Sequence, residues 1–193
     1  MRAGGTRTNV LAAALTAAAI AGGVTASANF APRTPAAADR ARLSRLAQSY
    51  LQQRADLVTR TAARSPNAAE PPAAATTSMR TELRAEFAAL VRQGRVYQHV
   101  DGGYIRAAVD VTVNDAAEEG GAVTLRVTED TRLYYPFTSA QVADGAPECE
   151  EYSLPHTLTF VRGPSGSWLL ASDEAELSGG PAPSTQVVAS GTA

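Results

Sequence analysis

Two ionisable residues share the parity of apolar neighbours on predicted β-strands. Glu129 alternates with Val127 and Leu133 along one strand, and His156 alternates with Leu158 along another. Because successive side chains of a strand point to opposite faces, we expect both on the face that packs against the core. There they suit an acid or base in a pocket. The alternative is structural: a bend or β-bulge at Glu129, and backbone partners for His156 at a strand edge.

Aromatic side chains gather on the same strands. Tyr134 and Tyr135 must point to opposite faces of one strand, so one of them is expected to be exposed. An exposed aromatic side chain serves a sugar or partner surface, whereas a buried one packs in the core. The predicted ligand-pocket residues are Glu129, His156, Tyr135 and Trp168.

A thiol-based catalytic set would combine Cys149, His156 and an acid such as Glu150 or Glu151. It requires the imidazole within hydrogen-bond reach of the sulfur and a third group that orients it. Cys149 lies in a predicted loop without a nucleophile signature, so we predict no catalytic residue. As the only cysteine, it cannot form an internal disulfide, and we expect it to be buried.

Charged residues also disfavour metal and nucleic-acid binding. His99 and His156 are the only histidines and lack ligand spacing. The acidic stretch 114–119 does not follow the order of a calcium-binding loop and suits a solvated turn. The formal net charge is -2, from 17 basic and 19 acidic residues spread along the chain, which leaves no basic stripe. We predict no metal, no cofactor and no nucleic-acid partner.

Helical periodicity precedes the strands. One helix is predicted to start at Pro35, to carry Arg60 and Arg64 near its end and to stop at Pro66. Its apolar face comprises Leu43, Leu46, Ala47, Tyr50, Leu51, Leu57 and Val58. After a loop over 65–77, a second helix is capped by Ser78 and closes at Gly94. Its stripe comprises Met79, Leu83, Phe87, Leu90 and Val91.

The period then changes from 3.6 to 2. The predicted strands cover residues 105–113, 123–137, 152–162 and 168–172. They are joined by a turn over 114–121, a polar loop over 138–150 and a tight turn over 163–166. The predicted fold class is therefore α+β, with two N-terminal helices packed on a curved four-stranded antiparallel sheet.

Residues spaced along the strands carry a family resemblance. They are Glu129, Thr131, Leu133, His156, Leu158, Phe160, Gly166, Trp168, Leu170 and Asp173. With this pattern, roughly residues 40–175 resemble the small secreted actinobacterial domains that often precede an amidase-like domain. Those domains are similar to the cone-shaped α+β superfamily that includes nuclear transport factor 2 and the SnoaL-like proteins. The resemblance implies a cone with a pocket, and it implies no catalytic residue because the amidase-like domain is not among these residues.

The N-terminus predicts export. Arg2 and Arg7 precede an apolar run over 10–21, and small residues before Ala28 suit cleavage after it. The run is shorter than the ~20 residues that cross a bilayer, so we predict the general secretory route and no stable membrane insertion. Retention as an anchor is the alternative. After the signal peptide over 1–28, we expect an exposed segment over 29–38. A single domain over 39–177 and a disordered tail over 178–193 follow.

These observations predict a secreted noncatalytic binding or spacer module at the bacterial cell envelope, with a cell-wall or exported protein partner. Two alternatives stay open. One is a small-ligand carrier or enzyme of the cone-shaped superfamily, with Glu129 and His156 in a cavity of roughly 300 Å³ or more. The other is a truncated relative of a secreted amidase-like protein.

Overall fold

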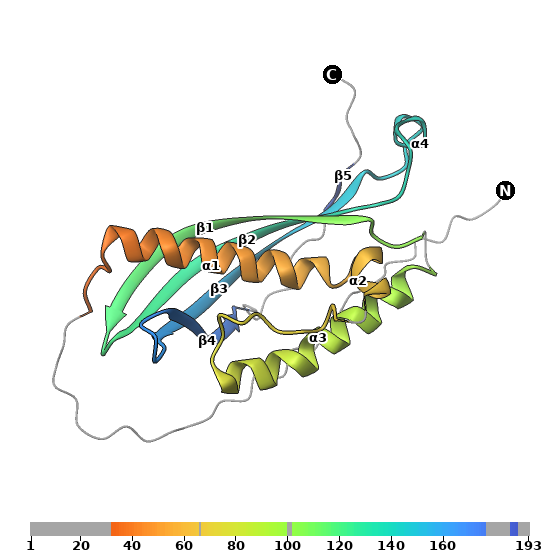
Figure 1. Cartoon of the computed structure of the whole chain (residues 1–193). Coiled ribbons are helices and arrows are strands. Elements are labelled where there is room, and N and C mark those ends of the chain that lie inside the picture. The colour runs from red at the N-terminus through yellow and green to blue at the C-terminus, as the bar shows by residue number, and fades with distance from the viewer. Residues whose placement is uncertain (1–31, 66, 100–101, 177–185, 189–193) are drawn as a thin grey trace.

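Five antiparallel strands form one curved sheet, and the first four follow one another in the order of the sequence. The computed structural model describes residues 32–188, except 66, 100–101 and 177–185. The predicted signal peptide therefore lies outside the described residues. These four strands are β1 (Arg106–Glu119), β2 (Ala122–Tyr134), β3 (Cys149–Arg162) and β4 (Trp168–Ala175). Each strand pairs with the next, and helices lie against one face of the sheet (Figure 1). The predicted α+β class is confirmed.

The first hairpin turns at Gly120 and Gly121, which have φ angles of 58° and 83°. A two-residue hairpin turn of this kind needs positive φ at both central positions, and glycine adopts it without strain. β1 therefore continues through the acidic stretch, and the predicted turn over 114–121 is wrong. The pairing with β2 shifts by one residue between Val113 and Asp115. The inward-facing positions of β1 therefore change from odd to even numbers, and Ala116 is buried.

The first predicted helix is divided into α1 (Ala37–Asp56) and α2 (Arg60–Arg64). The Thr59 hydroxyl donates a hydrogen bond to the Asp56 carbonyl at 2.7 Å. The Arg60 N–H donates to the Tyr104 carbonyl at 2.9 Å, which ties the chain to the residues before β1. These contacts end α1, so the prediction of one continuous helix up to residue 66 is wrong.

The second predicted helix is α3 (Thr77–Tyr97), and both of its ends differ from the prediction. Thr76, rather than Ser78, is the N-cap, because its side chain accepts the Met79 N–H at 3.3 Å. Gly94 lies inside the helix. A Cβ at this position would lie 2.8 Å from the Val58 carbonyl oxygen, so glycine lets α3 pack closely against the break after α1.

The core fills the space between the helices and the sheet. Its fully buried members are Leu43, Ala47, Leu51, Leu83, Phe87, Val123, Leu125, Val127, Leu158 and Phe160. In Figure 1, α1 runs along the strands of the sheet, and α3 lies below α1 in this view. This layering confirms that the N-terminal helices cover the sheet, with the core on the inward face. None of the described helices is long and apolar enough to cross a membrane.

Two short elements lie in segments that we predicted to be irregular. α4 (Ser139–Ala143) lies in the predicted loop and begins with a reciprocal capping box between Thr138 and Gln141. β5 (Gln186–Val188) lies in the predicted tail and pairs with Cys149–Glu151. The rest of residues 178–193 is outside the described part of the chain. β2 ends at Tyr134 rather than at residue 137, and β4 extends to Ala175 rather than 172.

Two glutamines of α1 cover the outer edge of β1. The Gln48 amide donates to the Val109 carbonyl at 2.6 Å and accepts the Val111 N–H at 3.1 Å. The Gln52 amide accepts the Val109 N–H at 3.0 Å and donates to the Ala107 carbonyl at 3.2 Å. An open strand edge can pair with another chain, so these amides block such pairing at the centre of β1.

We expect the double variant Gln48→Ala/Gln52→Ala to lower the free energy of unfolding by about 2 kcal/mol, because the edge loses these hydrogen bonds. The exposed edge should also promote self-association. Urea unfolding and sedimentation velocity measure the two effects, with Gln53→Ala as the matched control. A double variant that stays monomeric with unchanged stability would contradict the protective role.

Candidate functional site

The two predicted ionisable residues meet inside the fold, together with an aspartate. The β2–β3 register pairs Val127 with His156, which makes Glu129 a diagonal neighbour on the same face. His156 Nε2 lies 2.9 Å from Glu129 Oε2. The β3–β4 register pairs Leu158 with Asp173, and His156 Nδ1 lies 2.7 Å from Asp173 Oδ1. The imidazole is therefore held between carboxylates from the strands on either side.

The helices complete this arrangement. Arg54 and Tyr50 lie one turn apart on α1 and face the sheet together. Arg54 Nε lies 2.9 Å from Glu86 Oε1 on α3, and its Nη1 lies 3.8 Å from Glu129 Oε2. The Tyr50 hydroxyl donates to Asp173 Oδ2 at 2.8 Å. The interior polar cluster, as we call it, comprises Tyr50, Arg54, Glu86, Glu129, Thr131, Tyr152, His156 and Asp173.

In this cluster, hydrogen bonds and opposite charges together shift the pKa values more than burial does. Burial lowers the pKa of His156, but hydrogen bonds to Asp173 and Glu129 and their negative charges raise it to about 9. Burial raises the pKa of Glu129 and of Asp173, yet hydrogen bonds from His156 and the nearby cations bring both below their ordinary values. At neutral pH the ring is therefore an imidazolium between two carboxylates.

The centre of the cluster is closed to solvent. Glu129 is 0% exposed and His156 is 1% exposed. The remaining Glu129 oxygen, Oε1, accepts hydrogen bonds from the Thr131 hydroxyl at 2.5 Å and the Tyr152 hydroxyl at 3.2 Å. An imidazolium with both N–H groups engaged has no lone pair with which to accept a proton. The arrangement suits a structural role rather than general base catalysis.

The same geometry bears on metal binding. The two carboxylates lie against opposite nitrogens of His156, so the three groups do not converge on one point as metal ligands do. Within the described residues, no group of three or more histidine, cysteine or acidic side chains has an arrangement that could hold a metal ion.

The structural alternatives, a bulge at Glu129 and backbone partners for His156, do not match what surrounds these residues. The β2 register is continuous through Glu129 on both sides, so no bulge lies there. His156 lies on a strand that pairs on both sides, and carboxylates rather than backbone groups are its side-chain partners. Strand alternation places both residues inward, but it does not reveal that they contact each other.

The two predicted aromatic pocket residues lie elsewhere. Trp168 is buried, its Nε1–H donates to Asp39 Oδ1 at 2.8 Å, and the Arg162 guanidinium lies 3.9 Å from its ring centre. The Tyr135 hydroxyl donates to Glu150 Oε2 at 3.2 Å, in a group of aromatic rings beyond the end of β2. The structure therefore joins Glu129 and His156 in one site and assigns Tyr135 and Trp168 to others.

Cys149 is buried, as expected. Its Sγ lies 3.9 Å from Glu151 Oε1. Because Cys149 and His156 are an odd number of positions apart, seven, on a strand whose register with β2 is continuous, their side chains point to opposite faces. The thiol and the imidazole therefore do not form the nucleophile and base pair that catalysis would require.

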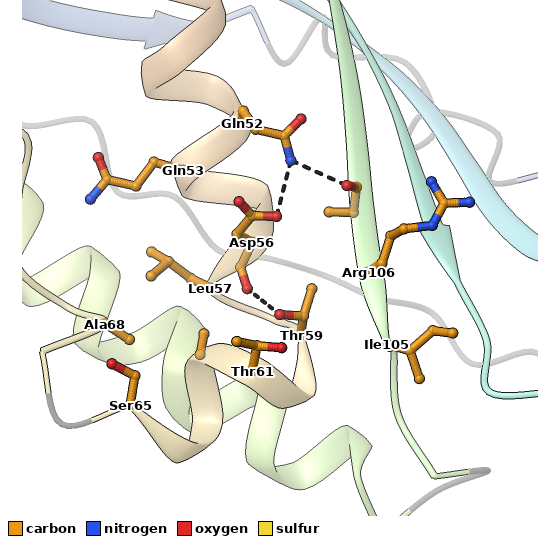
Figure 2. A pocket seen from close by; sticks show the side chains of 12 residues that line it. Gln52, Gln53, Asp56, Leu57, Thr59, Thr61, Ser65, Ala68, Ile105 and Arg106 are labelled. Atoms are coloured by element: carbon orange, nitrogen blue, oxygen red, sulfur yellow. Dashed lines mark hydrogen bonds between the residues drawn. The ribbon is translucent and has the colours of Figure 1, made fainter.

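An open hollow of about 540 Å³ lies at another place, between the end of α1, α2 and the start of β1 (Figure 2). Apolar walls come from Leu57, Ala62, Ala68, Ile105 and Ala107, and polar groups come from Gln52, Gln53, Asp56, Thr59, Thr61, Ser65 and Arg106. A smaller hollow of about 230 Å³ lies beside the tip of the first hairpin. None of the four predicted pocket residues lines either hollow.

The larger hollow exists because α1 ends at Asp56. Figure 2 shows the Gln52 side chain reaching from α1 to β1, with the Asp56 carboxylate beside it. Sequence reasoning missed this site because it continued the helix through residues 57–59. The Thr59 hydroxyl that bonds to the Asp56 carbonyl was the available local signal.

Comparisons with known proteins add little to this geometry. No family model matches the chain, and no curated protein matches it. Among solved structures, the crystal structure of the Kfla4162 protein from Kribbella flavida is similar at 16% sequence identity and a TM-score of 0.41. The match covers 72% of this chain and 90% of that chain. A likeness at this level carries no conclusion about function.

Proposed function

We propose that this protein is a secreted, noncatalytic binding module that acts at the bacterial cell envelope. One observation carries the noncatalytic part: the inward-facing Glu129 and His156 are fully buried and hydrogen bonded to other side chains. Catalysis at this position would need room for a substrate within hydrogen-bond reach of an acid or base. The interior polar cluster instead joins three strands and two helices.

The proposal of secretion rests on the N-terminal sequence, and an envelope partner is expected from that location alone. Basic residues, an apolar run and small residues before Ala28 have the order of a cleaved export signal. Binding is favoured over a passive spacer role by the larger hollow, since ligand sites commonly enclose about 300–1,000 Å³. Its volume of about 540 Å³ lies within that range. A carrier or enzyme built around Glu129 and His156 is less well supported, because neither hollow reaches them.

Co-sedimentation with purified bacterial cell walls tests the proposal. We expect the protein to pellet with the walls in a saturable manner and to be found outside the cytoplasm without residues 1–28. Mass spectrometry of the native protein measures the N-terminus, and bovine serum albumin serves as the nonbinding control. Protein that stays in the supernatant at every wall concentration, or that keeps residues 1–28 inside the cell, would contradict the proposal.

A further inference from the structure

Charge is divided between the helical layer and the sheet. The segment 32–99, which includes α1, α2 and α3, contains 11 arginines and 5 acidic residues. The segment 102–176, which includes β1 to β4, contains 4 arginines and 13 acidic residues. We expected the charges to be spread along the chain; instead, the helical layer is positively charged and the sheet is negatively charged. Protein surfaces ordinarily intersperse the two signs, and a field of one sign attracts a partner of the opposite sign.

One concentration of positive charge lies where α2 packs against the last turns of α3 (Figure 1). Arg92 and Arg95 lie one turn apart on α3, and Arg64 is the last residue of α2. All three side chains are exposed. No acidic residue occurs at positions 57–69 or 87–99, so the charge is not offset along these segments. We call Arg64, Arg92 and Arg95 the basic surface.

The basic surface is not explained by the stability of the fold. Arg54, by contrast, joins α1 to α3 through its ion pair with Glu86 at 2.9 Å. In the part of the chain that the structure describes, no ion pair includes a residue of the basic surface. Like charges one turn apart slightly destabilise a helix. The positive field of Arg92 and Arg95 is therefore directed at the solvent.

The chemistry of the basic surface suits a polymer of phosphate groups. Every basic residue of the chain is an arginine. The guanidinium group presents N–H donors in a fixed fork that matches two phosphate oxygens. A solvated arginine needs no partner, but a polyanion that binds several arginines releases its condensed counterions, and this release drives the association. Adjacent exposed arginines therefore favour a polyanion over a single small anion.

A lipid surface suits this part of the molecule less well. Among the described residues, Val96 and Ile105 are the only exposed large apolar side chains. A helix that lies in a membrane interface buries a whole apolar face among the lipids. Val96 beside Arg92 and Arg95 does not supply such a face. The partner is therefore expected to be a water-soluble or wall-bound polymer rather than a membrane.

We infer that the basic surface docks on a linear polymer that carries phosphate groups, with the helical layer toward the polymer and the sheet away from it. The acidic sheet supports this orientation. Asp110 and Asp130 are exposed and lie opposite each other on its outer face, so this side repels an anionic polymer. The inference rests on the proposed binding at the envelope and names the partner class for it.

Isothermal titration calorimetry of the purified protein with long-chain sodium polyphosphate tests this surface. We expect saturable binding whose affinity falls at least about tenfold between about 50 and 200 mM salt, because salt reduces the gain from counterion release. Vesicles of phosphatidylglycerol and phosphatidylcholine present phosphate on a lipid surface. They should bind more weakly than the polymer at equal phosphate concentration, and stronger binding to the vesicles would overturn the inference.

Variants show whether the basic surface is responsible. Arg92→Gln/Arg95→Gln should lower the affinity for polyphosphate about tenfold, because two charge-assisted contacts are lost. Arg126→Gln/Arg132→Gln is the matched control, since both positions are exposed on the outer face of β2 and the net charge changes equally. Salt screens charges on the far side of the molecule, so the control should stay within about twofold. An equal loss in both double variants would overturn the assignment to the helical layer.

No saturable binding to polyphosphate, or equal affinity of the unaltered protein and Arg92→Gln/Arg95→Gln, would also overturn the inference. These outcomes are separate from the test of the proposed function. Protein that pellets with cell walls but does not bind polyphosphate refutes only the partner class. Protein that binds polyphosphate through Arg92 and Arg95 but does not pellet with cell walls refutes the envelope function and supports the docking surface.

Discussion

Replacing Glu129 by alanine should lower the free energy of unfolding by about 3–5 kcal/mol, the cost of removing one partner from a buried ion pair. His156 Nε2–H and the hydroxyls of Thr131 and Tyr152 would lose their acceptor in a fully buried site. Arg54 would lose one of its two carboxylates. A cavity left by the missing side chain adds to this cost.

Chemical denaturation of Glu129→Ala measures the loss. Glu151→Ala is the matched control, because Glu151 forms an exposed ion pair with Arg132 at 2.8 Å and such pairs contribute little. We expect that control to lose less than about 1 kcal/mol. If Glu129→Ala also lowers the free energy of unfolding by less than about 1 kcal/mol, the interior polar cluster does not hold the sheet and helices together. Glu129→Gln, which keeps the shape, should fall between the two.

Stability should depend strongly on pH because His156 changes protonation inside the cluster. The pKa of His156 is raised from 6.5 to about 9 in the folded protein. Its contribution is therefore fully present below pH 6.5 and is lost as the pH rises through 9, a change of about 3 kcal/mol. The pKa values of Glu129 and Asp173 are lowered on folding, so their contribution is present above pH ~5 and is lost in acid.

We therefore expect the free energy of unfolding to be greatest between about pH 5 and 6.5 and to fall on both sides. Urea unfolding at a series of pH values measures this profile. His156→Gln should remove most of the decline between pH 6.5 and 9, whereas His99→Gln, at an exposed position outside the cluster, should keep it. A decline that survives in His156→Gln would have to come from other groups.

Strand alternation was sufficient to predict the inward-facing residues of β2 and β3. It placed Glu129 and His156 on the inward face, where both are buried. It could not predict that they meet, because contacts between strands depend on register. The β2–β3 register follows from the long connection between Tyr134 and Cys149, whose hydrogen bonds and short helix have no strong periodic signal. Asp173 was placed beyond the predicted strand end, although the resemblance included it.

Helical periodicity likewise predicted which residues face inward but not which of them meet. It identified the apolar face of α1, including Tyr50, but did not include Arg54 among the inward-facing residues. Arg54 lies four residues after Tyr50 on the same face, which was the available signal that it points inward. The break after Asp56 depends on contacts with Tyr104 and Gly94, which lie far along the chain. The hollow formed at that break therefore could not be predicted from local spacing.

The protonation state of His156 tests most directly whether the interior is a closed structural cluster rather than a catalytic site. Nitrogen NMR of the His99→Gln protein, which keeps His156 as its only histidine, follows both ring nitrogens from pH 5 to 10. We predict that both nitrogens are protonated at pH 7 and that the ring titrates near pH 9. A ring that titrates near its ordinary pKa, with one unprotonated nitrogen at pH 7, would contradict the closed cluster and favour an accessible base.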